Sequence, residues 1–309
     1  MGPAPSRPVA IALGIVVTFL WATSVVLIRV GLTTEDVQPI GFAGVRFTLA
    51  AILLLPLATP QLRAVRVWRA GRRPLLGVAA YGLLMFCLAQ VGFYLALGEL
   101  SAATVGLLMG LAPVVTALVT IRDRRERANA LQVIGIAVLI VGVVVYFGLE
   151  QPEAGISLAL LAGVSIPIVV GASARLGRHL AVDARRVFGG PLGLTALAMT
   201  VGGVTTLSLA LVLEGVPGFS PRAWLLIVWL AAVNTAFTYT LWTQIQRTLR
   251  AVESSVLADL TVILIAVLGW AVLDESLGAL EIAGLLLAVA GVFLVQLAPT
   301  LRGRRSASA

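Results

Sequence analysis

The sequence predicts an all-α integral membrane protein with ten transmembrane helices in two inverted five-helix repeats. Three observations lead to this fold class: the composition, the spacing of long apolar segments, and an internal repeat. Of 309 residues, 60% are apolar and only 12% are charged, which is more apolar surface than a soluble domain of this length can bury. The chain is therefore expected to lie in a lipid bilayer.

Ten apolar segments are each long enough to cross a hydrocarbon core of roughly 30 Å, which takes about 20 helical residues. The first follows a short basic flank but lacks an obvious cleavage motif, so we expect a retained helix rather than a signal peptide. Two connections, 98–101 and 246–252, are so short that nine and eleven are the competing counts. The segments are 8–30, 39–58, 74–98, 101–121, 129–148, 155–174, 189–213, 223–245, 252–272 and 278–298.

The internal repeat aligns residues 97–143 with 246–292 at a constant offset of 149 and without a gap. Its least accidental matches are Glu126 with Glu275, Gly135 with Gly284, and Gly142 with Gly291. We therefore expect two five-helix repeats, 8–148 and 155–298. Because five is odd, the second repeat begins on the face where the first ended, and so it lies inverted in the membrane.

The distribution of charge predicts the orientation. All 22 basic residues are arginine, and 19 of them fall in alternate loops or at the termini. Positive residues collect on the cytoplasmic side, so both termini are expected in the cytoplasm of a multi-pass protein of the cell (inner) membrane. This topology explains the net charge of +8, which then indicates contact with anionic lipid and no nucleic-acid partner.

Inverted repeats allow two states of similar energy that open to opposite sides around a site near the bilayer midplane. This arrangement favours a secondary transporter for a small molecule, working by alternating access. A permease subunit that depends on another chain, or a structural bundle without transport of its own, are the alternatives. The sequence leaves open whether the protein is a monomer or a homodimer.

Enzyme chemistry is not expected. The single histidine, His179, lies in a predicted cytoplasmic loop, and Asp259 has no second aspartate at its depth, so neither a catalytic pair nor a metal site is indicated. No HExxH or P-loop motif occurs, and we expect no metal, no cofactor and no ATP hydrolysis. The single cysteine, Cys87, cannot form an intrachain disulfide.

Several short motifs resemble the EamA-type carriers of the drug/metabolite transporter superfamily. They are Trp21-Ala22-Thr23-Ser24, Arg46, Leu111-Ala112-Pro113-Val114 and Glu126 in the first half, with Leu260-Thr261, Asp274-Glu275, Gly284 and Gly291 in the second. The resemblance implies ten helices, five-plus-five inverted topology, and export or exchange of small metabolites such as amino acids. The spacing of Gly135 and Gly142 belongs to the same resemblance. Two departures are that Val262 stands where Pro113 would be repeated and that Ile166 stands near where an aromatic residue matching Trp21 is expected.

Polar side chains at membrane depth predict the substrate site. Phe86, Gln90 and Tyr94 form one helical stripe, and the offset of 149 carries this stripe onto Thr235, Tyr239 and Thr243. The alternative is hydrogen bonding between helices. The expected lining suits a small amphipathic metabolite, best an amino acid or related amine, although aromatic rings also stack on drugs and nucleobases. It consists of Trp21, Gln90, Tyr94, Asn234, Tyr239 and Trp242.

Three further residues are assigned separate roles. Asp259 lies roughly 10 Å below the cytoplasmic surface, and we expect it to bind a proton or a cationic group and couple it to transport, the alternative being a hydrogen bond to Ser255. Pro113 removes a backbone hydrogen bond and is expected to form a hinge or gate. Arg46 is expected to extend toward the outer interface or to cap carbonyl groups, the alternative being contact with the substrate.

Overall fold

The computed structural model describes residues 5–69, 71–112, 114–115, 130–147, 157–249 and 251–307, and all regular structure in these ranges is helical. Two long helices each contain a short π-helical segment in their middle; they are α3–η2–α4 and α10–η3–α11. The elements are α1 (Arg7–Thr33), α2 (Pro39–Ala64), η1 (Val67–Arg69), α3 (Arg72–Gly82), η2 (Leu83–Leu88), α4 (Ala89–Glu99), α5 (Ala102–Met109), α7 (Ala130–Phe147), α8 (Leu158–Val187), α9 (Pro191–Leu213), α10 (Pro221–Ala231), η3 (Ala232–Phe237), α11 (Thr238–Ile245), α12 (Ala251–Leu273) and α13 (Ala279–Ala307).

Helix starts follow local sequence signals. Ser101, Ser157 and Ser220 precede α5, α8 and α10, and each Oγ accepts a hydrogen bond from the backbone N–H three residues later, at 3.1, 3.1 and 3.0 Å. These bonds satisfy amides that have no partner within the first turn. Prolines 39 and 191 begin α2 and α9, where a missing N–H does no harm.

Within the described residues, seven helices are long and apolar enough to cross a membrane, by length and composition. Two shorter apolar helices, Leu158–Ser173 and Ala279–Val295, correspond to two further predicted spans. The predicted fourth span, 101–121, lies partly outside the described residues. The seven are Arg7–Thr33, Pro39–Ala64, Arg72–Glu99, Ala130–Phe147, Pro191–Leu213, Pro221–Ile245 and Val256–Leu273.

The prediction of a loop over 175–186 is wrong, because α8 continues to Val187 and carries His179. Alanine, leucine and arginine are good helix formers, and they make up much of this segment. The helix stops at Phe188 before Gly189, which has φ +72°. A Cβ at Gly189 would lie 2.7 Å from the backbone of Gln61, so both the turn and the close approach to α2 require glycine.

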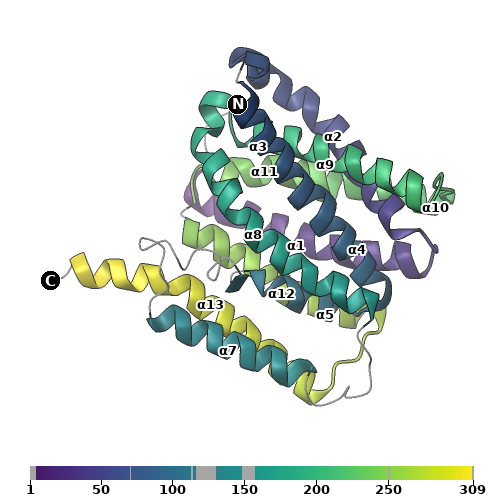
Figure 1. Ribbon diagram of the computed structural model, residues 1–309. Helices are drawn as coiled ribbons and strands as arrows, with labels where there is room; N and C mark the ends of the chain where they lie inside the picture. Colours follow the sequence, from purple (N-terminus) through teal and green to yellow (C-terminus); the bar gives the residue numbers. More distant parts are fainter. Residues whose placement is uncertain are drawn as a thin grey trace.

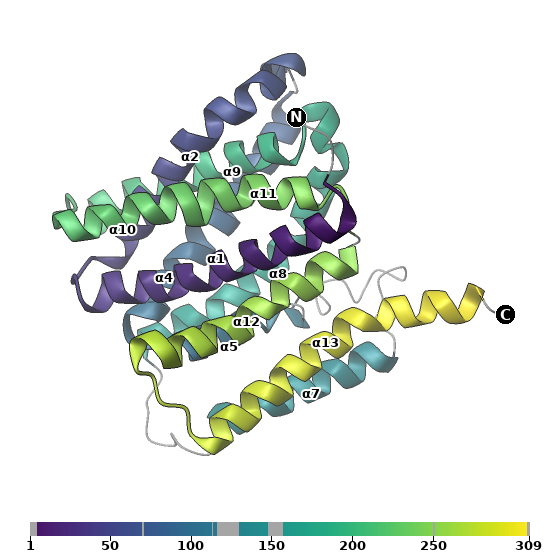
Figure 2. The same ribbon diagram turned by 180° about the vertical axis from the view of Figure 1, so that it is seen from behind.

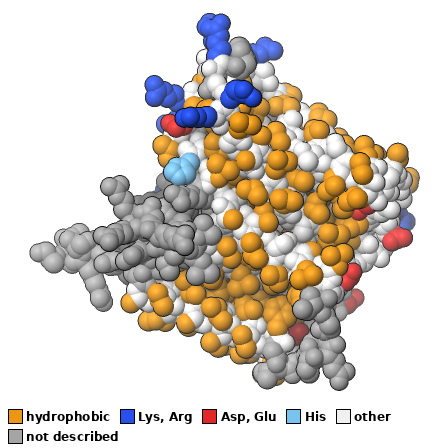
Figure 3. Space-filling view, viewed as in Figure 1, with side chains coloured by type: hydrophobic (Ala, Val, Ile, Leu, Met, Phe, Trp, Pro, Cys, Tyr) orange, Lys and Arg blue, Asp and Glu red, His pale blue; other side chains and the backbone are white. Residues whose placement is uncertain are grey.

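Large apolar side chains cover the flanks of the bundle, while charges gather at its ends. Leu57, Leu76, Leu161 and Trp270 are each more than half exposed, and Figure 3 shows such apolar groups spread over the visible face. In the same view, most basic side chains lie at the top, with an acidic group beside them, and most acidic side chains lie toward the right and lower right, with a basic group beside them. An apolar girdle between charged ends is typical of contact with lipid.

Helices at matching places in the two halves pack closely and antiparallel. In α7 and α13, which lie side by side at the lower edge in Figures 1 and 2, a Cβ at Gly142 would lie 2.7 Å from the Gly284 carbonyl oxygen. One at Gly291 would lie 2.7 Å from the Gly135 oxygen. The later glycine of α7 faces the earlier glycine of α13 and the reverse, so the two helices run in opposite directions. Because glycine has no side chain, the two backbones can touch.

The same reversal occurs between α2 and α9. A Cβ at Gly44 would lie 2.6 Å from the Leu207 Cα, and one at Gly203 would lie 2.8 Å from the carbonyl carbon of Phe47. A later residue of α2 therefore contacts an earlier residue of α9, so these two helices are also antiparallel. In both views α1 and α12 lie between the α2–α9 and α7–α13 pairs, and α2 itself contributes to the candidate site.

Candidate functional site

One wide turn occurs in each of the two interrupted helices. Leu83–Leu88 and Ala232–Phe237 are π-helical, with backbone bonds that span five residues instead of four. Both ends of the two segments differ by the offset of 149 that was found in the sequence, so the segments occupy equivalent positions in the two halves. Because single π turns inside α-helices often accompany functional sites, the neighbourhood of η2 and η3 is where we place the candidate site.

The two polar stripes predicted from the sequence begin in these turns and meet in the bundle. Phe86 lies in η2 and Tyr239 in α11, and their ring centroids are 6.0 Å apart. Gln90, in α4, donates through Nε2 to the Met85 carbonyl at 3.4 Å. The amide of Gln90 is therefore engaged within its own helix, and Tyr239 carries the contact between the stripes.

Three of the predicted lining residues form one aromatic group, consisting of Trp21 from α1 with Tyr239 and Trp242 from α11. The Trp21 ring lies 6.1 Å from that of Tyr239 and 5.0 Å from that of Trp242, tilted by 59° and 58°. Tilted rings at this spacing attract one another and also present faces to a bound apolar or cationic group. All three side chains are partly exposed.

Asn234 joins η3 to α1 beside this group. Its Nδ2 donates to the Leu20 carbonyl and to the Thr23 Oγ1, the latter at 3.1 Å. Its Oδ1 is buried and has no hydrogen-bond partner among the described residues. An acceptor left unpaired in a low-dielectric interior is costly, so this oxygen marks a place where a donor is missing.

Arg46 contradicts the expectation that it extends toward the interface. It is 5% exposed and its guanidinium points into the bundle, where each nitrogen donates to a hydroxyl from a different helix. Nε donates to Thr235 Oγ1 at 3.0 Å, one Nη to Tyr94 Oη at 3.0 Å, and the other to Ser24 Oγ at 2.8 Å. We call Arg46, Ser24, Tyr94 and Thr235 the arginine cluster.

Two phenylalanines connect the arginine cluster to the aromatic group. The guanidinium carbon of Arg46 lies 5.2 Å from the centre of the Phe47 ring, and Phe47 lies 5.8 Å from Phe86, which touches Tyr239 as described. Cation–π and ring contacts of this kind are individually modest. Together they form a continuous wall, so the two groups belong to one region of the bundle.

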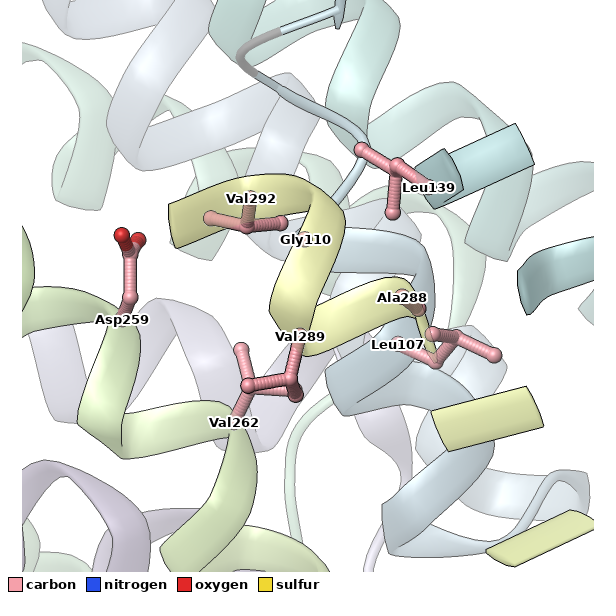
Figure 4. A pocket seen from close by; sticks show the side chains of 8 residues that line it. All are labelled: Leu107, Gly110, Leu139, Asp259, Val262, Ala288, Val289 and Val292. Carbon is pink, nitrogen blue, oxygen red and sulfur yellow. The ribbon is translucent and has the colours of Figure 1, made fainter. Parts of the chain in front are cut away.

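Asp259 lies apart from this region, on α12, in a small pocket with an apolar lining (Figure 4). Its Oδ2 is buried and forms no hydrogen bond with any described residue. Figure 4 shows its carboxyl group pointing away from Val262 and the other apolar side chains. The remaining lining residues are Leu107, Gly110, Leu139, Val262, Ala288, Val289 and Val292.

The Asp259 pocket contains residues that correspond to each other in the two halves. The offset of 149 relates Gly110 to Asp259 and Leu139 to Ala288, and all four line the pocket. The pocket therefore lies where the two halves meet, with a carboxyl group contributed by one half only. Pro113, the predicted hinge, and the Ser255 side chain, the predicted partner of Asp259, lie outside the described residues.

Sequence reasoning missed the roles of Arg46 and Ser24 in this site. The available signal is the pair Ala43 and Ala50, which are buried and lie three residues before and four residues after Arg46, on the same face of α2. Small residues on the same face favour a helix–helix interface at that face, whereas an arginine that extends toward the membrane interface lies near a helix end.

The sequence and the fold were compared with those of known proteins. The model of the EamA-like transporter family matches residues 8–148 and again 154–297. A solved structure described only as "Crystal structure of protein" is similar over 97% of this chain and 99% of its own, at 20% identity and a TM-score of 0.63. At that identity the likeness concerns the fold alone. No curated protein matches the sequence.

Proposed function

Because this chain belongs to the EamA-like transporter family, and is therefore a multi-pass membrane transporter and not an enzyme, we propose that it is a secondary transporter that moves a small metabolite by alternating access. The observation that carries the proposal is the pair of π turns, which occupy equivalent places in the two halves. A site between two matched, interrupted helices can be opened by either half in turn.

We propose further that the ten helices form two inverted repeats. The antiparallel packing of α7 with α13 and of α2 with α9 supports this, because equivalent helices of an inverted repeat run in opposite directions. The gathering of arginines at one end supports a cytoplasmic location for that end and for both termini, in the inner membrane.

The substrate in this proposal is a small metabolite, best an amino acid or a related amine, carried by export or exchange. The aromatic group provides faces for an apolar side chain or an ammonium group. Asn234 adds a buried acceptor one residue from the arginine cluster. Gln90 and Tyr94 complete the lining, with Tyr94 acting through Arg46.

Asp259 is the proposed coupling residue. A carboxylate inside an apolar pocket is unstable unless it gains a proton or a cation, and no described residue supplies a hydrogen bond to its Oδ2. The pocket lies between the halves, so a change of charge there acts on the interface that must rearrange during transport.

The test is uptake and efflux of a panel of labelled amino acids and amines in proteoliposomes, with and without a pH gradient. The proposal predicts saturable movement of at least one compound, and a change in its steady-state accumulation when a pH gradient is imposed. If no compound moves unless a second protein is added, the chain is a permease subunit. If none moves under any condition, transport of amino acids and amines is excluded.

A further inference from the structure

We propose that two equivalent contacts between the halves are the gates of this protein, one near each end of the bundle. In each gate a leucine of one half lies against a glycine of the other, and a threonine latches the gate at the end proposed to be cytoplasmic. This inference rests on the proposed function and adds the places at which the halves separate. Its basis is a set of contacts related by the offset of 149, together with one hydrogen bond that has no counterpart.

The two contacts match residue by residue. A Cβ at Gly14 of α1 would lie 2.5 Å from Cδ1 of Leu257 in α12, and the two helices lie side by side in Figures 1 and 2. A Cβ at Gly163 of α8 would lie 2.7 Å from Cδ1 of Leu108 in α5. The offset of 149 relates Gly14 to Gly163 and Leu108 to Leu257. We call the first contact the cytoplasmic gate and the second the outer gate.

The surroundings of the two glycines correspond as well. Cδ1 of Ile245 would lie 3.5 Å from a Cβ at Gly14, and its counterpart, Cβ of Ala96, would lie 3.5 Å from a Cβ at Gly163. Each leucine is six residues after the start of its helix, which is roughly 9 Å at 1.5 Å per residue. Because the repeats are proposed to be inverted, these two helices start at opposite ends of the bundle. Both gates are closed in the structure.

Other contacts between the halves are of a different kind. Gly44 of α2 lies against the backbone of Leu207, and Gly189 before α9 lies against the backbone of Gln61, so α2 and α9 touch near both of their ends. Backbone cannot withdraw without moving a whole helix, whereas the tip of a leucine withdraws by a change of rotamer. The leucine contacts are therefore the ones that open with little strain, and the α2–α9 pair is suited to act as a pivot.

One hydrogen bond distinguishes the cytoplasmic gate. Thr18 Oγ1 lies 2.8 Å from the Gly14 carbonyl oxygen and 3.0 Å from the Leu257 carbonyl oxygen, so its single O–H is shared by the two residues of this gate. The counterpart of Thr18 is Pro167, inside α8. Proline has no hydroxyl, and it has no N–H to donate to the Gly163 carbonyl. The cytoplasmic gate is therefore latched, whereas α8 can bend at the outer gate.

Reporter thiols can be placed behind both gates without altering them. Val17 and Ile166 are counterparts, three residues beyond the two glycines, and are 0% and 3% exposed. In a background of Cys87→Ala, Val17→Cys and Ile166→Cys are introduced singly into the full-length chain. The rate of reaction with a charged methanethiosulfonate reagent is then measured from each side, in right-side-out and inside-out membrane vesicles without substrate.

Removal of each leucine should open one gate only. Leu257→Ala should raise the rate of Val17→Cys from the cytoplasmic side at least tenfold and should leave the rate of Ile166→Cys from the outside unchanged or lower. Leu108→Ala should do the reverse. The two substitutions are matched controls for each other, because they remove the same side chain at equivalent positions.

The latch is tested with a matched pair of threonines. Thr18→Val keeps the shape of the side chain and removes its hydroxyl, so the rate of Val17→Cys from the cytoplasmic side should rise at least threefold. Thr200→Val is the control, because the Thr200 hydroxyl bonds the Ala196 carbonyl of its own helix at 2.7 Å. Equal rates in the two threonine variants would overturn the latch.

Loss of folding has a separate signature. Each variant should elute as a single species, and an unfolded protein would react equally fast from both sides. The inference is overturned if either leucine variant raises the rates from both sides or raises neither. The proposed function fails separately, if no labelled compound crosses vesicles containing the unaltered protein, because the thiol measurement uses no substrate.

Discussion

Asp259 lines a pocket whose other seven lining residues offer no side-chain hydrogen bond, and its Oδ2 is buried without a partner among the described residues. Its counterpart in the first half is Gly110, so only the second half contributes a carboxyl group at the interface between the halves. In an apolar pocket, proton binding converts an unfavourable charge to a neutral group, and this change is available for coupling.

We therefore predict that Asp259→Asn uncouples transport from the pH gradient. Asparagine resembles the protonated carboxyl in shape but cannot change its charge. Exchange of substrate at equal pH should continue, whereas accumulation driven by the gradient should fall to the level without a gradient. Asp274→Asn is the control, because Asp274 is exposed and its φ of +52° suits asparagine. Unchanged accumulation in Asp259→Asn would exclude coupling through this residue.

Trp21 connects two rings of the aromatic group across helices. A substrate group packed on the face of Trp21 gains roughly 0.5–1.5 kcal/mol beyond burial, and about 1.4 kcal/mol corresponds to a factor of ten in binding. Trp21→Ala should therefore raise the half-saturation concentration for transport about tenfold. The matched control is Trp270→Ala, since Trp270 is 65% exposed. An equal effect of the two substitutions on half-saturation would mean that Trp21 does not line the site.

Single residues were predictable where polarity at depth was the signal. Tyr239 stands out on a polar stripe and Trp21 as an aromatic residue in the middle of its helix, and their rings come together with that of Trp242. Their contact with a substrate stays a prediction. The inward direction of Arg46 was not predictable from its depth, because that direction is set by hydroxyls from three other helices. A linear pattern does not contain such contacts.

At the scale of elements, α7 and α13 depend on glycine. Even a methyl group at Gly142 would lie 2.7 Å from the Gly284 carbonyl oxygen, so the two backbones would have to separate. We predict that Gly142→Ala lowers the melting temperature of the detergent-solubilised protein on the order of 5 °C, from an overpacking cost of about 1–3 kcal/mol.

Gly98→Ala provides the comparison for Gly142→Ala. A Cβ at Gly98 meets nothing within 4 Å, and alanine favours helix over glycine, so the melting temperature should stay the same or rise. Equal melting temperatures for the two variants, both at that of the unaltered protein, would show that the α7–α13 contact is not as close as described.

The π turns illustrate what the sequence does not reveal about elements. Apolar periodicity predicts where the third and eighth helices lie, and both are found there. A single wide turn displaces one backbone hydrogen bond and leaves that periodicity nearly unchanged. The length of α8 was not predictable for another reason. A cluster of arginines is typical of a cytoplasmic loop, but arginine is also a good helix former, and the helix continues through it.

The whole molecule is organised by the separation of its charges, and the proposed orientation can be measured. In a background of Cys87→Ala, which removes a 4% exposed thiol, Asp274→Cys should react with a membrane-impermeant maleimide added to intact cells. Arg69→Cys should react only after the membrane is permeabilised, because the basic end is proposed to face the cytoplasm. The reverse pattern of labelling would invert the topology.

The class of the whole molecule was more predictable than its site. Apolar composition, ten apolar segments and the offset of 149 are properties of many residues at once, so no single substitution obscures them. The all-helical architecture and the family agree with that prediction. The site depends instead on a few side chains that the packing of α1, α2, α4 and η3 brings together.

Alternating access is tested most directly by counterflow. Vesicles containing the protein are loaded with unlabelled amino acid and diluted into a trace of the labelled compound, with no ion gradient. If the carrier changes orientation faster with substrate bound than without it, labelled compound accumulates inside. Its internal concentration should then exceed the external one for a time before the two become equal. A monotonic approach to equality would contradict alternating access and would indicate a channel-like pathway.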